Sequence, residues 1–517
     1  MRKQTKLVAV LSGTALLAIG ASMTSFARGW TQEDGEWVYL DSDGDRVTEE
    51  WKKSGSNYYW LDEDGLMATN ELIEDDDDYY YVNESGIRIT NQWISVDNED
   101  DEEVDGKEVD VLWYYMGSSG QAYKASDGNN FKNSLINGRR YLFDEDGHMV
   151  SGWTEDGDDM YYLGDETEGW AYTGWQYLEL DEDIEDEYDQ DEAWFNFKSS
   201  GKMRKDDRVY ITNAYYTFDE NGVMLDDWVY GSPAVAAGAV ASPGRAFYAY
   251  ETGNQASGWI QTYENDDQDG DLKWYYAVSS NKNTAFNSGG SYADGSAAVT
   301  KLENGDDVDT EYAAGRVAAK VIRSKTYLFD DTGKMLTGVF YIHENEEEDG
   351  VNGVRCQGGS GVLKPGIYFF DKQENTGHQG EMQTGKTSIT YDGDAYTYYF
   401  QGTGAAYTSQ IKDSTLYDGY GVRVEAEDGN SNSVISISEL DFPAGAEGNI
   451  TISGTKYDAG TFVVSSSGKV KRNGTTTIDG VKYEVSNYFV TKAYDKDDDS
   501  ETDLGNYQVM HAVENDD

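Results

Sequence analysis

Bulky apolar residues recur along the first hundred residues of this chain with a constant step of 21 positions. The residues that keep this step are Trp30, Trp51, Leu72 and Trp93; Trp37, Tyr58 and Tyr79; and the glycines Gly44, Gly65 and Gly86. Three sets of residues in one register indicate a repeat, and a period in this range is typical of arrays of small structural units. Because such an array presents many copies of one surface, the pattern favours binding over catalysis.

Each repeat has the pattern of a short β-hairpin. In the second repeat, residues 58–61 form an aromatic strand, residues 62–65 a turn and residues 66–69 a return strand. Aspartate at the first turn position can accept hydrogen bonds from nearby backbone N–H groups, and glycine at the fourth accepts a positive φ. The same turn pattern recurs at 41–44, 83–86, 144–147, 219–222 and 330–333.

Adjacent hairpins are expected to stack. A lone two-stranded hairpin is only marginally stable in water, so neighbouring hairpins must bury their aromatic faces against each other. The sequence therefore predicts an all-β fold, a β-solenoid of stacked β-hairpin repeats of about 20 residues with acidic loop insertions. The scarcity of proline, with four residues in 517, agrees with continuous hairpins.

The regular spacing is interrupted at three places. Two insertions are acidic and the third is rich in small residues, and they span 97–110, 179–192 and 231–244. Insertions in repeat arrays usually form loops on one face, so we expect solvated loops at all three. The pattern predicts regular aromatic repeats at 28–280, divergent repeats with insertions at 281–410, and a Ser/Thr/Val-rich β segment at 411–517. That last segment is predicted to be either a cap of the array or a small separate domain.

Residues 1–27 have the pattern of a secretory signal peptide. A basic region at 2–6 precedes an apolar region at 7–20, and residues 25–27 offer a small-x-small cleavage pattern. The apolar region is too short to span a bilayer, and no later stretch is long and apolar enough. We therefore expect a secreted chain located at the cell surface or cell wall, with no membrane span.

The charge balance is extremely acidic. The chain has 98 acidic and 40 basic residues, which gives a net charge of −58. Such a field repels nucleic acid, so no nucleic-acid partner is expected, and it attracts cations. Solubility is an alternative purpose, since a repeat chain with many exposed rings needs charge to avoid self-association. An aromatic content of 14% argues against disorder.

Residues that carry catalytic chemistry are sparse. Cys356 is the single cysteine, the four histidines are scattered, and neither a metal-ligand spacing nor a nucleophile motif is present. The abundant carboxylates are turn positions of the repeat. The acidic runs at 41–45 and 75–78 offer oxygen ligands of the kind Ca²⁺ prefers, but neither contains a full ligand loop. We predict no catalytic residue, no metal site and no cofactor.

The repeat resembles the choline-binding, or cell-wall-binding, repeats of Gram-positive surface proteins. It shares their order of Gly-Trp, a short polar stretch, Trp/Tyr-Tyr-aromatic and Asp-x-x-Gly-x-Met, and residues 147–153 are most like a family unit. The Gly-Trp element stands at Gly29-Trp30, Gly152-Trp153, Gly174-Trp175 and Gly258-Trp259. The resemblance covers roughly residues 29–410, strongly to Trp274 and weakly afterwards.

In that family the ligand lies between successive hairpins. The resemblance implies a cage built from the Gly-Trp indole, an aromatic at the start of the next strand and an aromatic of the following repeat. A quaternary ammonium donates no hydrogen bond, and ring faces hold it by cation–π attraction of about 0.5–2 kcal/mol per contact. Several weak cages on one chain would then gain from multivalency against a polymer.

Carried over by position, the resemblance implies two best cages and several weaker ones. The best cages are Trp30 with Trp37 and Tyr58, and Trp51 with Tyr58 and Tyr79; the weaker ones are Trp93 with Trp113, Trp175 with Trp194, and Trp259 with Trp274; and Trp153 is a further ligand-binding candidate. Some repeats depart from the pattern. Leu72 replaces the indole in the third unit, and Glu50, Gln92 and Asp227 replace the glycine of other units.

The predicted function is a non-catalytic, extracellular cell-wall-binding protein. Its partner would be an envelope polymer similar to teichoic acid that bears choline or another amine. A polysaccharide is the alternative, because glucan-binding and clostridial-toxin repeats look similar and stack aromatic rings on sugar faces. A third possibility is a structural surface protein whose aromatic residues all form the core. Intact cages favour an amine ligand, whereas flat and open aromatic platforms favour a sugar.

Overall fold

The computed structural model describes residues 29–181, 184–229, 247–263, 270–279, 284–286, 297–303, 307–309, 316–344, 352–374, 376–391, 393–427, 429–443, 447–497 and 508–513. The predicted signal peptide and the third insertion lie outside these residues. The described residues form β-strands and short 3-10 helices but no α-helix, which confirms the prediction of an all-β chain. Among them no helix is both long and apolar enough to cross a membrane.

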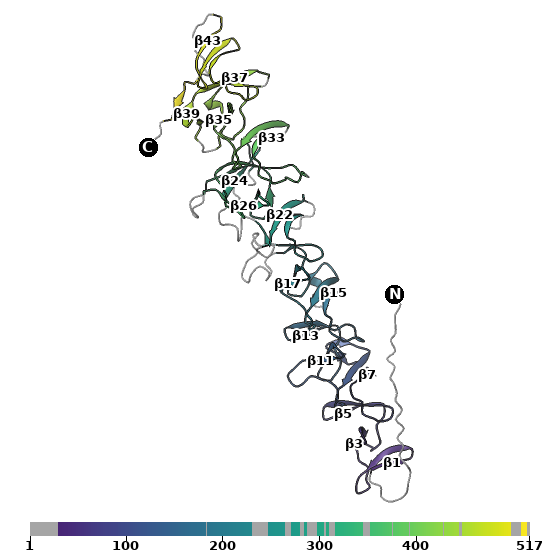
Figure 1. Cartoon of the computed structure of the whole chain (residues 1–517). Coiled ribbons are helices and arrows are strands. Elements are labelled where there is room, and N and C mark those ends of the chain that lie inside the picture. Colours follow the sequence, from purple (N-terminus) through teal and green to yellow (C-terminus); the bar gives the residue numbers. More distant parts are fainter. Residues whose placement is uncertain are drawn as a thin grey trace. The chain divides into compact units, whose positions relative to one another are not determined.

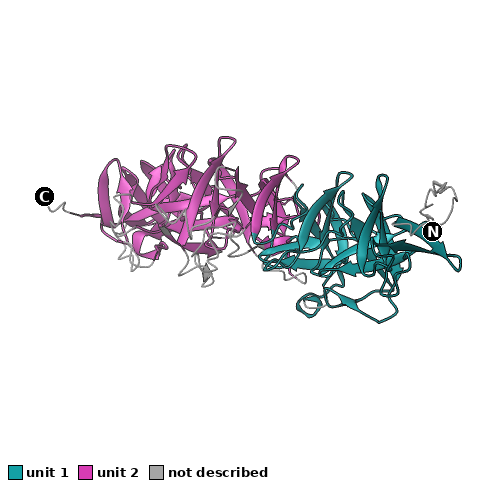
Figure 2. Cartoon of the chain, turned by 90° about the horizontal axis from the view of Figure 1, so that it is seen from below, with its two compact units in different colours: residues 1–206, 218–224 teal, residues 207–217, 225–517 magenta. Residues whose placement is uncertain are grey.

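The chain divides into two compact units, Met1–Asp206 with Phe218–Met224, and Asp207–Thr217 with Leu225–Asp517 (Figure 2). In the first unit, antiparallel hairpins follow one another in chain order (Figure 1). They are β1 (Gly29–Glu33) with β2 (Glu36–Leu40), β3 (Glu50–Ser54) with β4 (Asn57–Leu61), β5 (Glu71–Asp75) with β6 (Asp78–Val82), β7 (Gln92–Asp97) with β10 (Val111–Met116), β11 (Lys132–Ile136) with β12 (Arg139–Phe143), β13 (Trp153–Asp156) with β14 (Asp159–Tyr162), and β15 (Gly174–Glu179) with β16 (Glu192–Phe197).

The second unit continues with hairpins and then broadens into larger sheets. Its smaller sheets are β17 (Asp207–Ile211) with β18 (Ala214–Phe218), β19 (Asp227–Val229) with β20 (Phe247–Ala249), β21 (Gly258–Thr262) with β22 (Lys273–Val278) and β23 (Thr284–Ala285), and β33 (Gly385–Tyr391) with β34 (Asp394–Phe400). A nine-stranded sheet contains β24 (Ala297–Glu303), β25 (Asp307–Asp309), β26 (Arg316–Ile322), β27 (Lys325–Phe329), β28 (Met335–Leu336), β29 (Gly338–Ile342), β30 (Val354–Gln357), β31 (Val362–Leu363) and β32 (Gly366–Phe370).

The C-terminal part of the second unit holds two five-stranded sheets. One contains β35 (Gln410–Lys412), β36 (Thr415–Tyr417), β38 (Ile450–Ile452), β39 (Thr455–Ala459) and β44 (His511–Ala512), and the other β37 (Asn432–Ser436), β40 (Thr461–Ser465), β41 (Gly474–Ile478), β42 (Val481–Ser486) and β43 (Phe489–Asp495). The boundaries at 280 and 410, drawn from the sequence, stay a prediction.

The strand register gives each hairpin two aromatic faces. In the hairpin β3–β4, Trp51 pairs with Trp60, whereas Lys52 pairs with Tyr59. Because successive side chains of a strand point to opposite faces, Trp51 and Tyr59 lie on opposite sides of the hairpin. Tyr59 contacts Trp30 of the preceding hairpin, with ring centroids 5.2 Å apart, and Trp51 contacts Tyr80 of the following one at 5.1 Å. Each hairpin therefore packs its rings in both directions.

The turn chemistry expected from the sequence is confirmed. Asp62 Oδ1 accepts hydrogen bonds from the backbone N–H groups of Asp64, at 3.0 Å, and Leu66, at 2.8 Å. Gly65 follows with a φ of 74°, which a residue with a side chain seldom adopts. The same local bonding is made by Asp41, Asn83, Asp144, Asp219 and Asp330.

Removing one of these turn carboxylates should cost a moderate amount of stability. We expect Asp62→Ala to lower the free energy of unfolding by about 1–2 kcal/mol, because two backbone donors lose their acceptor. Asp62→Asn is the matched control, since Asn83 already makes the same bonds in the next repeat. Urea denaturation of both variants measures the difference. Equal losses in the two variants would contradict this role for the side-chain oxygen.

Successive hairpins are joined by a recurring backbone hydrogen bond. The residue two positions after the turn glycine donates its N–H to a carbonyl at the start of the aromatic strand in the preceding hairpin. The bonds are Met67 to Trp37 at 2.8 Å, Arg88 to Tyr58 at 2.9 Å, Ala122 to Tyr79 at 2.8 Å, Met149 to Trp113 at 2.8 Å and Met203 to Met160 at 2.7 Å. The same bond joins Arg423 to Thr397 at 2.8 Å, so the repeat pattern extends beyond residue 410. We call the donating residue the bridging residue of its repeat.

The expectation that the acidic insertions are solvated loops holds only in part for the first two: most of their described residues are exposed, but each buries one apolar residue. Val104, in the small hairpin of β8 (Glu103–Val104) and β9 (Lys107–Glu108), is 3% exposed and packs with Leu112 and Tyr114. In the second insertion Leu180 is buried, and the Tyr188 hydroxyl, just after a 3-10 helix at Glu185–Glu187, donates to Asp219 Oδ2 at 2.7 Å. The few apolar residues of each insertion pack into the core and so hold the acidic segment against the hairpins.

Candidate functional site: aromatic cages between hairpins

The most complete ring arrangement surrounds Trp259 on β21. Its ring centroid lies 6.2 Å from that of Trp274 on β22, with the planes at 90°, and 4.7 Å from that of Tyr327 on β27, at 67°. Met335 belongs to the same apolar cluster. The Trp274 indole N–H donates to Gln379 Oε1 at 3.1 Å, which fixes the orientation of this ring. Both indoles are only half-buried, so part of each remains accessible to solvent.

A similar arrangement exists at Trp93 on β7. Its ring centroid lies 4.8 Å from that of Tyr141, and Trp113 and Met149 join the same cluster. The long insertion does not spread the hairpin apart, because β7 and β10 keep a continuous register in which Trp93 pairs with Tyr115. The pair predicted from the sequence, Trp93 and Trp113, is therefore brought into one cluster.

At Trp30 the structure brings together a different third ring from the predicted one. Trp30 contacts Tyr39 across its own hairpin, with centroids 5.5 Å apart, and Tyr59 of the next hairpin at 5.2 Å. The sequence predicts Tyr58 in this place, but Tyr58 lies on the face of its strand opposite to that of Tyr59. The strand-start residue Trp37 is half-buried, and its carbonyl accepts the N–H of Met67.

Tyr58 instead belongs to the next arrangement, with Trp51. These two rings and Tyr80 surround the guanidinium of Arg88, whose Cζ lies 4.2 Å from the Tyr58 centroid, 5.0 Å from Trp51 and 5.4 Å from Tyr80. Tyr79, the ring predicted here, contacts Tyr114 at 6.0 Å on the other side of its hairpin. The predicted pairing of Trp51 with Tyr58 is thus present, and Tyr80 supplies the third ring.

The remaining candidates vary in completeness. Trp175 and Trp194 lie 6.4 Å apart at 82°, but Trp194 is 44% exposed. Trp153 packs against Phe195 at 4.8 Å, and the strand-start position of its hairpin is Met160 rather than an aromatic residue. Three rings and a methionine are therefore grouped at Trp259 and at Trp93, and three rings are grouped at Trp30.

Sequence reasoning missed two parts of each cage. The ring from the next hairpin is the middle residue of its five-residue strand, as at Tyr59, Tyr80 and Tyr141, rather than the residue before it. The bridging residue, often methionine, was not considered as a cage wall. The alternation of side chains along a strand could have identified this ring. Trp51 pairs with Trp60, so the neighbouring Tyr59 points to the opposite face of the hairpin, the one that faces Trp30.

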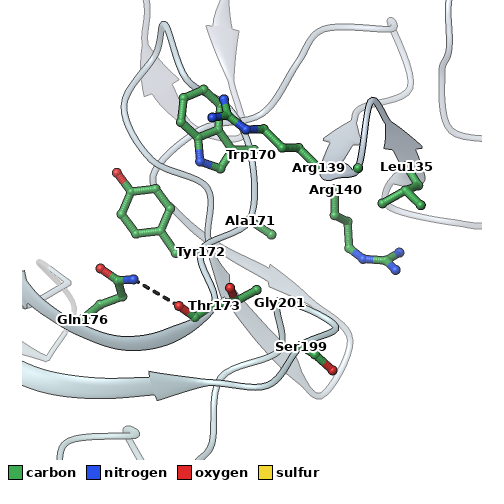
Figure 3. Close-up of a pocket in the computed structure, with 11 residues that line it drawn as sticks. Leu135, Arg139, Arg140, Trp170, Ala171, Tyr172, Thr173, Gln176, Ser199 and Gly201 are labelled. Atoms are coloured by element: carbon green, nitrogen blue, oxygen red, sulfur yellow. Dashed lines mark hydrogen bonds between the residues drawn. The ribbon is translucent and has the colours of Figure 1, made fainter.

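One interval between hairpins holds a cavity in place of a cage. It has a volume of about 490 Å³ and is bordered by Arg139, Arg140, Trp170 and Tyr172 (Figure 3). The Arg139 guanidinium lies 3.7 Å from the Trp170 ring centroid. Arg140 stands at the strand-start position that Trp37 and Trp113 hold in other repeats. Its carbonyl accepts the N–H of Ala171, the bridging residue of the next repeat, at 2.8 Å. This interval therefore lacks the ring set of a cation site.

The acidic turns have bonding partners of their own. Asp75 Oδ2 accepts the indole N–H of Trp51 at 3.0 Å, and Asp78 Oδ2 accepts the Gln121 side-chain N–H at 2.7 Å. Within the described residues no group of three or more histidine, cysteine or carboxylate side chains is arranged to hold a metal ion. The Ca²⁺ alternative at 75–78 therefore gains no support from the geometry.

A buried histidine links the first acidic insertion to the repeat. His148 is 4% exposed, and its Nε2 lies 2.8 Å from the Tyr114 hydroxyl. Its Nδ1 lies 3.2 Å from Asp144 Oδ2, and its Nε2 lies 3.7 Å from Glu102 Oε2. Burial alone lowers the His148 pKa, but the hydrogen bond and charge of Asp144, with the charges of Glu102 and Asp146, outweigh it and raise the pKa above its ordinary value.

This raised pKa predicts a pH-dependent contribution to stability. Because the folded-state pKa lies above the unfolded value of about 6.5, protonated His148 stabilises the fold at low pH, and this gain is lost as pH rises through the folded pKa. We expect the stability difference between the wild type and His148→Gln to grow as pH falls from about 8 to about 6. Chemical denaturation of both proteins across this range measures it, and a constant difference would contradict the expectation.

Comparisons with known proteins agree with the repeat pattern. The family model described as a choline-binding repeat matches residues 47–87, which span the second and third hairpins. This match confirms the resemblance inferred from the Gly-Trp and turn motifs. No curated protein matches the sequence.

Several solved structures are similar to this chain. The modular autolysin LytC of Streptococcus pneumoniae is 16% identical over 60% of this chain and 52% of its own, with a TM-score of 0.34, so the chain spans about half of that autolysin structure. Choline binding protein F of the same organism is 18% identical over 77% of this chain and 98% of its own, with a TM-score of 0.27. The choline-binding domain of CbpL from S. pneumoniae is 28% identical over 39% of this chain and 98% of its own, with a TM-score of 0.17. All three TM-scores lie below 0.5, so these similarities carry no argument about function.

Proposed function

We propose, from the choline-binding repeats that this chain carries, that it is a secreted, non-catalytic protein that attaches to the cell wall. Its partner is an envelope polymer bearing choline or a similar amine, held in aromatic cages between hairpins that stack as a β-solenoid. The observation that carries this proposal is the arrangement of Trp259, Trp274 and Tyr327 with Met335 between consecutive repeats. The same positions are filled by the same residue types around Trp93.

The physical chemistry of the cages suits a quaternary ammonium. Such a cation has no N–H to donate, so it needs polarisable ring faces instead of hydrogen-bond acceptors, and each ring contributes about 0.5–2 kcal/mol. The net charge of −58 raises the local concentration of cations around the chain. Weak sites repeated along one chain bind a polymer more tightly than any single site binds the free amine.

A non-catalytic role fits the placement of the reactive side chains. Cys356 on β30 is 4% exposed within an apolar cluster, and burial raises the pKa of its thiol. His343 bonds to Thr300, and His148 is enclosed by Tyr114 and carboxylates. The Cys356 thiol and the His148 imidazole are thus enclosed in the core, away from a substrate in solvent.

Choline should stabilise the protein against heat. At ten times the dissociation constant, each independent site adds about 1.4 kcal/mol to the free energy of unfolding, through RT ln(1 + [L]/Kd). Thermal unfolding of residues 28–517 with increasing choline chloride measures the effect, and sodium chloride at equal ionic strength is the control. A rise in Tm with choline that salt does not reproduce is expected. Identical curves with both salts would sink the proposal.

A sugar-binding role is the second candidate, and one exposed ring pair favours it. Tyr177 and Trp194 on the hairpin β15–β16 are 50% and 44% exposed, with centroids 5.2 Å apart and planes at 48°. Exposed rings of this kind suit stacking on a sugar face. Quenching of tryptophan fluorescence by soluble glucan, lost in Trp194→Ala but kept in Trp259→Ala, would support it. No quenching, with choline stabilisation present, would leave the amine as the ligand.

A further inference from the structure

Arg88 stands at a position where several other repeats carry methionine. It is the bridging residue of the third repeat, and its backbone N–H donates to the Tyr58 carbonyl at 2.9 Å. Met67 is the bridging residue of the first interval and donates its N–H to the Trp37 carbonyl at 2.8 Å. Met149 is the bridging residue of the fourth interval and packs in one apolar cluster with Trp93 and Trp113. The third repeat therefore places a long cationic side chain where the second and fifth repeats place a thioether.

The guanidinium of Arg88 occupies the centre of a three-ring set. Its Cζ lies 4.2 Å from the centroid of Tyr58, 5.0 Å from that of Trp51 and 5.4 Å from that of Tyr80. These are distances at which a cation is attracted by ring faces. They correspond by repeat position to Trp37, Trp30 and Tyr59 of the preceding interval, so the guanidinium lies where the proposed function places a ligand.

The Arg88 side chain is also buried at Nε, next to its aliphatic carbons. The turn glycine Gly120 packs so closely that a Cβ there would lie 2.8 Å from Arg88 Nε. Nε is buried and has no hydrogen-bond partner among the described residues. Burial lowers the pKa of this arginine, although nearby tyrosines oppose the shift. A buried donor without an acceptor is costly, so the ring contacts must offset that cost.

Arginine at this repeat position does not need such an environment. Arg46, the equivalent residue of the first repeat, pairs with Glu33 through its Nη2 at 2.6 Å. Arg423, a bridging residue of the second unit, donates from its Nε to Glu425 at 2.5 Å. Arg88 differs from both in facing rings, and this contrast points to a specific role for its charge.

We propose that Arg88 is the resident cation of the Trp51 cage. Its guanidinium takes the place of a quaternary ammonium, so this interval is closed to ligand and binds the next repeat to the hairpin before it. The identity of one side chain, arginine or methionine, then decides whether an interval between hairpins is a ligand site. The inference rests on the proposed choline-binding function.

Arg208 shows a related arrangement in the second unit. Its Cζ lies 3.8 Å from the ring centroid of Tyr215 and 6.0 Å from that of Phe247, and its Nε donates to Gln255 Oε1 at 2.8 Å. Arg208 is the second residue of β17, the place that Trp175 holds on β15. Guanidinium groups thus enter ring-lined intervals from two different repeat positions.

A reciprocal exchange of arginine and methionine tests the proposal. The number of choline molecules bound by the full mature chain is measured by equilibrium dialysis for the wild type, Arg88→Met and Met67→Arg. Arg88→Met should bind one more choline than the wild type, and Met67→Arg one fewer. Arg46→Met is the matched control and should leave the number unchanged, because Arg46 pairs with a carboxylate. Arg88→Ala provides a second opening variant if Arg88→Met does not fold.

The outcomes separate this inference from the proposed function. Choline binding by the wild type with no added site in either Arg88 variant overturns the resident-cation proposal alone. No choline binding by the wild type overturns the proposed function. In that case ¹⁵N-arginine spectra of the full chain test whether the Arg88 guanidinium lies among the rings. An Arg88 Hε resonance that the rings shift upfield, and that moves downfield in Tyr58→Leu, supports the resident-cation proposal. An unshifted resonance overturns it.

Discussion

Replacing Trp259 with alanine should lower the free energy of unfolding of the second unit by about 3–5 kcal/mol, the range for large aromatic residues that anchor a core. The indole packs against four rings, and the contacting residues are Trp274 at 6.2 Å, Tyr276 at 5.2 Å, Tyr327 at 4.7 Å and Phe329 at 6.0 Å between centroids. Its loss leaves a cavity that Tyr327 and Phe329, themselves buried, cannot close without moving their strand.

The same change should remove one ligand site, so two readouts are needed. Urea denaturation gives the stability loss, and the choline-induced rise in Tm gives the binding loss. Trp194→Ala is the control, since Trp194 is 44% exposed and its removal should cost only about 1–2 kcal/mol. A Trp259→Ala protein as stable as the wild type would show that the indole is not part of the core. Full stabilisation by choline in this variant would show that Trp259 holds no ligand.

Gly169→Ala is the second change with a large expected effect, about 2–5 kcal/mol of lost stability. Gly169 has a φ of 62°, and alanine in this region costs about 1–2 kcal/mol. A Cβ at this position would also overlap Met149 Sδ and lie 2.7 Å from its Cγ, and overpacking adds about 1–3 kcal/mol. Met149 is 7% exposed in the cluster of Trp93 and Tyr141, so it has little room to move.

Gly174→Ala separates the two contributions. Gly174 has a similar φ of 74°, but a Cβ there meets nothing within 4 Å. We therefore expect this variant to show the backbone cost alone, about 1–2 kcal/mol, and to keep its choline response. Gly169→Ala should also weaken binding at the Trp93 cage, because the displaced thioether enters it. Equal stability losses in the two variants would mean that the Met149 side chain moves aside with no loss of free energy of unfolding.

The local structure was largely predictable from the sequence. The 21-residue step, the Gly-Trp element and the Asp-x-x-Gly turn identified the first hairpins, and Asp62 caps its turn as expected. These features act within a few residues of each other, through backbone geometry and short-range hydrogen bonds. The insertions were harder, because their composition is acidic and only single residues such as Val104 and Leu180 reach the core.

The candidate site was predictable in kind but not in detail. The tryptophans Trp30, Trp51, Trp93 and Trp259 do contact rings of the following hairpin, as the family resemblance implied. The choice of Tyr58 over Tyr59 for the Trp30 cage was wrong, because it followed spacing along the chain and did not count which face of the strand each ring occupies.

The sequence by itself determined that this chain repeats an aromatic hairpin, where each hairpin turns, and which residues could face a cation. Only the tertiary structure decided which rings meet and what lies between them. Arg88 is 30 residues from Tyr58 and looks like an ordinary surface cation, yet the backbone bond that joins the two repeats carries its guanidinium into the ring set. The reason is physical: spacing fixes local conformation, whereas a cage exists only where separate hairpins pack face to face.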